Sequence, residues 1–113
     1  MKIEDLHSVY FLGIGGIGMS ALARYFLKRG VRVTGYDKTS SALTQALEDE
    51  GGVVSYTDSE ISGEFDLCVF TPAVPQSHGA YSHFKNSSVP MLKRAELLGL
   101  ISHNHTTYAV AGT

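Results

Sequence analysis

Residues 8–20 read Ser-Val-Tyr-Phe-Leu-Gly-Ile-Gly-Gly-Ile-Gly-Met-Ser, and this stretch decides the fold. Its first five residues are apolar, β-branched or aromatic after the opening serine and stop at a glycine, which predicts a strand buried on both faces. From Ile17 to Arg29 the apolar residues recur about one helical turn apart and the run ends before Gly30, which predicts an amphipathic helix. A glycine-rich loop therefore joins a buried strand to a helix.

Strands and helices alternate along the rest of the chain. Strands are predicted at 31–36, 53–56, 66–71 and 89–92, and helices at about 41–51, between 76 and 86, and at 93–101. Right-handed crossovers between such units produce an α/β fold that is Rossmann-like and doubly wound. We expect a mostly parallel five-stranded sheet of order 3-2-1-4-5 with helices on both faces. A polar segment at 102–106, the one apparent boundary, separates this unit from a last strand at 108–110.

Composition limits the class of protein. A chain of 113 residues with 43% hydrophobic content fits one ordinary domain. A formal charge of −2 without a run of like charges argues against nucleic acid and anionic membranes as partners, and favours a small molecule. One cysteine, Cys68, together with the lack of a leader or a long apolar stretch, fits a reducing cytoplasm. Cys68 lies in the middle of a predicted strand, so we expect a buried structural thiol.

The glycine loop predicts a phosphate site because of its setting between a strand and a helix, since its G-x-G-x-x-G spelling alone is weak. Gly13 permits a tight turn, Gly15 and Gly16 remove the Cβ atoms that would keep a phosphate from the backbone, and Gly18 lets the helix pack closely on the strand. The positive end of the helix then offers amides that hold phosphate without a lysine, near Ile17, Gly18, Met19 and Ser20.

Two further segments should face this loop. In a doubly wound sheet the ligand lies where the strand order reverses, so the loop after Phe70 should meet the loop after Leu12. Thr71 and the amides around Ala73 and Val74 would then reach a phosphate or sugar, although Thr71 fits equally well as a cap of the strand end. Asp37 follows Gly18 by 19 residues, where an acid commonly accepts ribose hydroxyls; pairing with Lys38 in a turn is the alternative.

No catalytic constellation and no metal site are predicted. His103 and His105 have no obvious third ligand, and His78 and His83 flank a predicted helix as surface residues. From residue types and spacing alone, the loop and Asp37 are most often explained by an NAD-binding domain of an oxidoreductase or of a regulatory sensor. That interpretation is the alternative to the one that follows.

Four segments of the chain resemble the Mur ligases of peptidoglycan synthesis. Residues 11–23, Phe-Leu-Gly-Ile-Gly-Gly-Ile-Gly-Met-Ser-Ala-Leu-Ala, are similar to the amino-terminal signature of the alanine-adding branch. Gly-Tyr-Asp at 35–37 resembles the end of the family's second strand, and Lys-Arg-Ala-Glu-Leu-Leu at 93–98 resembles the start of one of its helices. Ala-Val-Ala-Gly-Thr at 109–113 resembles the strand that enters the family's ATP loop.

The resemblance implies a ligand and a division of labour. Residues 1–106 would be a UDP-sugar-binding Rossmann-like domain and 107–113 the start of a truncated central ATP-binding domain. The ligand would be UDP-N-acetylmuramate, with Asp37 at the ribose or uracil and the diphosphate held by Gly15, Gly16, Ile17, Gly18, Met19, Thr71, Ala73 and Val74. ATP and Mg²⁺ would act only in the full-length ligase, with its central and C-terminal domains, so the fragment itself would need no cofactor and be inactive. Asp58 replaces a histidine common in relatives and is left out of the site.

Overall fold

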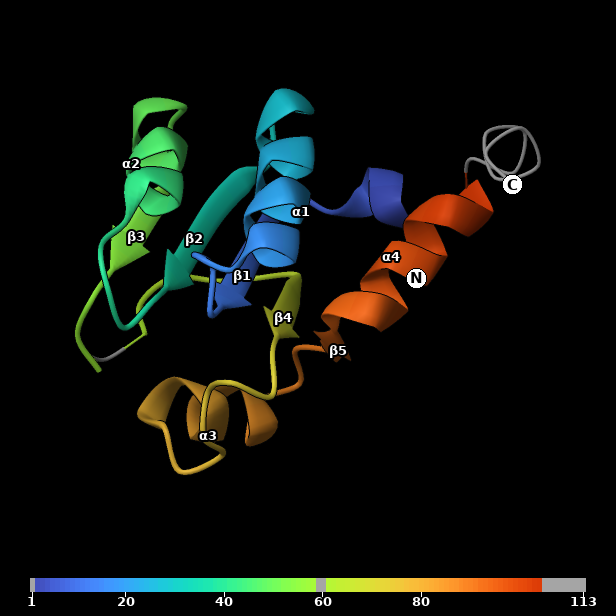
Figure 1. The fold of residues 1–113 in the computed structure, drawn as a ribbon. Coiled ribbons are helices and arrows are strands. Elements are labelled where there is room, and N and C mark those ends of the chain that lie inside the picture. Colours follow the sequence, from blue (N-terminus) through green and yellow to red (C-terminus); the bar gives the residue numbers. More distant parts are fainter. Residues whose placement is uncertain (1, 59–60, 105–113) are drawn as a thin grey trace.

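The chain folds around one parallel sheet, which a computed structural model describes for residues 2–58 and 61–104 (Figure 1). Its five strands lie in the order β3-β2-β1-β4-β5, and all four neighbouring pairs are parallel. This confirms the predicted Rossmann-like α/β class and strand order. The strands are β1 (Ser8–Leu12), β2 (Arg32–Tyr36), β3 (Val53–Ser55), β4 (Leu67–Phe70) and β5 (Met91–Lys93).

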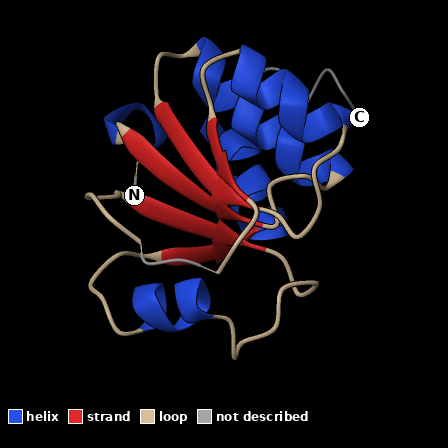
Figure 2. Ribbon diagram, turned by 90° about the vertical axis from the view of Figure 1, so that its left-hand side faces the viewer, coloured by secondary structure: helices blue, strands red, loops and turns tan. Residues whose placement is uncertain are grey.

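Helices cover both faces of the sheet, unequally (Figure 2). Three of them pack on one face together with a short 3-10 turn that the sequence pattern does not predict, η1 (Ile3–Asp5): α1 (Ile17–Lys28), α2 (Ala42–Asp49) and α4 (Arg94–Asn104). The other face carries α3 (Gly79–Lys85). The predicted strand at 108–110, the segment 107–113 assigned to a second domain, and His105 lie outside the described residues.

The core forms because successive residues of β1 point to opposite faces. Val9 and Phe11 join the core under α1, α2 and α4, while Tyr10 and Leu12 join the core under α3. All five residues of β1 are buried. The central strand is therefore fixed on both faces, and the loop that follows it starts from a rigid base.

The single cysteine behaves as predicted. Cys68 is fully buried in β4, and burial raises the pKa of its thiol to about 12.

Among the described residues, no helix has both the length and the apolar character that a membrane span needs.

Candidate functional site

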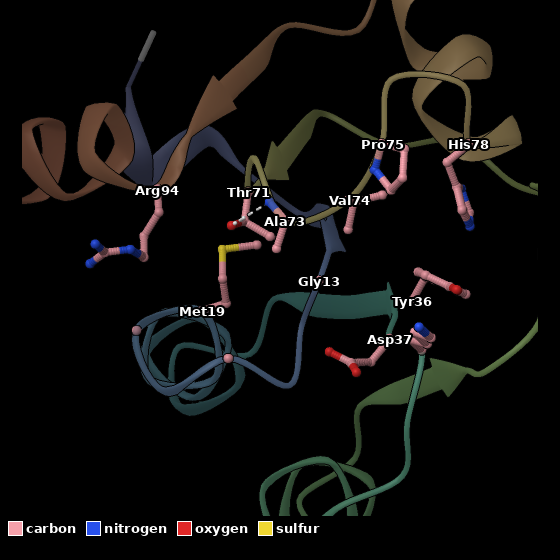
Figure 3. Close-up of a pocket in the computed structure, with 13 residues that line it drawn as sticks. Gly13, Met19, Tyr36, Asp37, Thr71, Ala73, Val74, Pro75, His78 and Arg94 are labelled. Atoms are coloured by element: carbon pink, nitrogen blue, oxygen red, sulfur yellow. Dashed lines mark hydrogen bonds between the residues drawn. The ribbon is translucent and has the colours of Figure 1, made fainter.

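A pocket of about 400 Å³ opens where the strand order reverses, at the carboxyl ends of β1, β2 and β4 (Figure 3). Its wall combines the glycine loop, the end of β2, the loop after β4 and the start of α4. The lining residues include seven of the nine predicted site residues: Gly16, Gly18, Met19, Asp37, Thr71, Ala73 and Val74. The remainder of the lining consists of Gly13, Tyr36, Lys38, Pro75, His78 and Arg94.

Gly13 makes the turn out of β1. Its φ of +89° is the left-handed conformation that glycine adopts without strain, and a Cβ there would overlap the Thr71 methyl group. The turn is held because the amides of Gly13 and Ile14 both donate to the carbonyl oxygen of Tyr36, at 2.8 and 2.9 Å. The two predicted loops therefore meet, as expected, with Gly13 directly against the loop after β4.

The start of α1 points its positive end at the pocket. The first helical hydrogen bond runs from the Ser20 amide to the Gly16 carbonyl oxygen at 2.7 Å, so the amides of residues 17–19 precede it and have no helical acceptor. The first turn contains no acidic residue that would neutralise this end. Gly15 and Ile17, although predicted, do not line the pocket, and Ile17 is 84% exposed.

Asp37 ties the glycine loop to the end of β2. Its Oδ2 accepts from the Gly15 amide at 2.7 Å and its Oδ1 accepts from the Thr39 amide at 3.1 Å. A Cβ on Gly15 would stand 2.6 Å from Oδ2. Position 15 therefore has no room for a side chain beside this carboxylate. The Gly15 amide is already bonded to the same carboxylate. The loop amides left for an anion are those nearer the helix.

The loop after β4 is closed on itself. The Val74 amide donates to the Thr71 carbonyl oxygen at 3.1 Å, and the Ala73 amide donates to Thr71 Oγ1 at 3.4 Å. Both amides that the sequence pattern offers to a phosphate therefore already have acceptors within the loop. The Thr71 hydroxyl keeps its own proton for donation, so its side chain is the polar donor of this wall.

Arg94 and Lys38 are cationic residues that line the pocket but are absent from the predicted site, and Arg94 lies at the glycine loop. Arg94 is the first residue of α4, and its side chain packs against the first turn of α1. A Cβ on Gly18 would stand 2.7 Å from Arg94 Cδ. The Arg94 side chain, rather than a strand, is therefore what a side chain at position 18 would meet first. The resemblance at 93–98 contains this arginine, and that segment was the signal that could have identified it.

His78 corrects the prediction of a surface histidine. Its side chain is only 10% exposed, it lines the pocket, and its ring centroid lies 4.3 Å from that of Tyr36. Nδ1 accepts from the Ala80 amide at 3.2 Å. Asp58, which does not line the pocket, accepts from the Gly79 amide at 3.2 Å and lies 3.7 Å from Nδ1. No sequence pattern around His78 signalled its burial.

Comparison with known proteins shows which family the chain resembles. Two curated relatives, each a UDP-N-acetylmuramate–L-alanine ligase, come from Cytophaga hutchinsonii and Phocaeicola vulgatus and are 46% and 44% identical over the whole chain. The chain spans 26% of the length of each, about a quarter. A crystal structure of the UDP-N-acetylmuramate-alanine ligase of Thermotoga maritima superposes with a TM-score of 0.76 and 29% identity, over 82% of this chain and 22% of that one.

The match to a family is equally extensive. The sequence profile described as "Mur ligase family, catalytic domain" covers residues 8–106, which include every strand of the sheet and every residue that lines the pocket. The chain therefore belongs to the Mur ligase family.

Proposed function

We propose that this chain is the amino-terminal, UDP-binding domain of a ligase that joins L-alanine to UDP-N-acetylmuramate, and that the pocket at the carboxyl edge of the sheet holds the UDP end of this substrate. The curated relatives are ligases of this name, and the chain matches about a quarter of their length. The likeness supports the choice of substrate, while the geometry of the pocket supports the choice of site.

The observation that carries the proposal is unbalanced positive charge at one end of the pocket. The amides of residues 17–19 bring the positive end of α1 there, and the Arg94 guanidinium lies beside Gly18. Within residues 2–58 and 61–104, Arg94 has no carboxylate partner. A diphosphate supplies the missing negative charge, and it accepts hydrogen bonds from both sources.

The other end of the pocket suits the nucleoside. Asp37 accepts hydrogen bonds from two backbone amides, and its remaining lone pairs can accept hydrogen bonds from the ribose hydroxyls. The same carboxylate disfavours a ligand with a phosphate on the ribose 2′-oxygen, because two negative charges would meet. NAD carries a diphosphate and a ribose too, so Asp37 and the loop alone do not select the ligand, and the choice of a UDP-sugar rests on the family.

Bond formation would take place outside this domain. ATP and Mg²⁺ would be held by the central domain of the longer ligase, of which residues 107–113 would be the beginning, and the C-terminal domain would complete the site. The domain in hand would bind and orient the nucleotide end of the substrate. We therefore expect the 113-residue chain to bind UDP without hydrolysing ATP.

Replacing Arg94 by glutamine tests the site. A hydrogen bond to a charged group contributes about 1.5–3 kcal/mol, so Arg94→Gln should weaken UDP binding roughly 10- to 100-fold in titration calorimetry. Arg29→Gln is the matched control. Arg29 is the C-cap residue at the opposite end of α1, so this substitution removes the same charge at a position away from the pocket. Equal losses in the two variants would mean that only net charge matters, and would contradict the placement of the diphosphate at Arg94.

A further inference from the structure

One polar atom beside the pocket lacks a partner. His78 Nε2 is buried and, in the described part of the chain, has no hydrogen-bond acceptor, although the residue lines the pocket. Buried polar groups in folded proteins are nearly always paired, and leaving a donor unpaired costs about 1–3 kcal/mol. No other buried side-chain nitrogen or oxygen among these residues is unpaired in this way.

The surroundings of His78 determine which nitrogen carries the proton. Nδ1 accepts from the Ala80 amide at 3.2 Å, so in the neutral ring the proton is on Nε2. The ring is held in place by the Tyr36 ring on one side and by the turn that Asp58 fixes through the Gly79 amide. Nε2 is therefore a positioned hydrogen-bond donor, and what it lacks is an acceptor.

His78 belongs to the end of the pocket that lies away from Arg94. In Figure 3 the Arg94 side chain stands at one end, Met19 and Gly13 lie between, and Tyr36, Pro75 and His78 gather at the other. The first end is cationic, whereas the second combines the rings of Tyr36, His78 and Pro75 with Asp37 and Lys38, which follow Tyr36 at the end of β2. A flat, weakly charged group fits the second end, and a carbonyl oxygen on that group would satisfy Nε2.

We propose that His78 is a specificity-determining residue of this pocket, and that its Nε2–H donates to a carbonyl oxygen of the pyrimidine base of the bound nucleotide. The half-buried Tyr36 ring, at the end of β2, packs against the His78 ring, so donation from the buried Nε2 to a base requires the Tyr36 ring to turn aside and then lie against that base. This inference rests on the proposed function, since it places the base by placing the diphosphate at Arg94. Its ligand class is an oxo-pyrimidine nucleoside diphosphate.

Two substitutions of His78 separate donation from structure. Asparagine keeps an oxygen where Nδ1 accepts from Ala80 but has no donor at the reach of Nε2, whereas the longer glutamine places an amide N–H near the Nε2 position. We expect His78→Asn to weaken UDP binding about tenfold and His78→Gln to retain most of the affinity. Binding of inorganic pyrophosphate, which has no base, should be the same in both variants and the unchanged chain.

The outcomes distinguish the inference from the proposed function. If the unchanged chain does not bind UDP, the proposed function fails. If it binds UDP and His78→Asn binds equally well, only the role of His78 is wrong. A loss that is equal for UDP and for pyrophosphate, or a thermal midpoint of unfolding that falls in step with affinity, would also overturn the inference, because His78 would then act by shaping the loop.

Discussion

The carboxylate of Asp37 holds the glycine loop against β2, and its effect on stability can be measured apart from any ligand. It accepts from the Gly15 amide at 2.7 Å, and a methyl group on Gly15 would stand 2.6 Å from the same oxygen. Asp37 is also held by the Thr39 amide, so it cannot move away without breaking a second bond. The side chain at position 15 therefore decides whether the loop keeps its conformation.

We predict that Gly15→Ala lowers the free energy of unfolding by about 1–3 kcal/mol, because it breaks a hydrogen bond to a charged group. Gly16→Ala is the control, since a Cβ there has no heavy atom nearer than 3.7 Å, and should cost less than about 1 kcal/mol as an N-cap change. Urea unfolding at neutral pH measures both. Equal destabilisation would show that the Asp37 contact is unimportant.

Single residues were predictable from the sequence when a spacing rule placed them. Asp37 was found by its distance from Gly18, and Thr71 by its position after a buried strand. Arg94 and His78 could not be found in that way, because each reaches the pocket only through the direction of its side chain. The hydrogen bond from the Gly15 amide to Asp37 could not be predicted for the same reason. Fewer amides are therefore left to bind a ligand than the sequence predicted.

At the scale of elements, β1 and β4 bury two ionisable groups side by side. Tyr10 on β1 and Cys68 on β4 are register partners, and both face the core under α3. Burial raises the pKa of Cys68 to about 12, and burial, followed by the neighbouring Cys68, Asp58 and Tyr36, raises the pKa of Tyr10. The folded chain therefore holds both protons to higher pH than the unfolded chain does.

This linkage predicts a loss of stability in alkali. Above about pH 9 the unfolded chain loses the Cys68 proton while the folded chain keeps it, so the free energy of unfolding falls as pH rises from 9 towards 12. One such group changes stability by about 1.4 kcal/mol per pH unit in that window. Urea unfolding between pH 7 and 10.5 should show a shallower fall for Cys68→Ala than for the unchanged chain. Parallel curves would contradict the prediction.

Element positions were the part of the fold that the sequence predicted best. The bounds of β1 were predicted without error, because its apolar run stops at Gly13, and α1 differs by one residue, because it lies between Gly16 and Gly30. The short edge strands and α3 were placed within a few residues. η1 was missed, since three residues of mixed character carry no periodic signal.

At the scale of the whole molecule, the site exists because of topology. β1 ends at Leu12 and β4 begins 55 residues later at Leu67, yet they pair in parallel, and this brings the glycine loop against the loop after β4. The alternation of strands and helices predicted this pairing, and the structure confirms it. The fold does not choose between a UDP-sugar and a dinucleotide, because both ligands suit a phosphate loop at a reversal of strand order.

Calorimetric titration of the 113-residue chain with UDP-N-acetylmuramate and, in parallel, with NAD tests the proposed function most directly. We predict saturable one-to-one heats with UDP-N-acetylmuramate and none with NAD. At 100 times the dissociation constant, the UDP-sugar should stabilise the fold by about 2.7 kcal/mol. Saturable binding of NAD without any response to UDP-N-acetylmuramate would contradict the assignment of this pocket to a UDP-sugar.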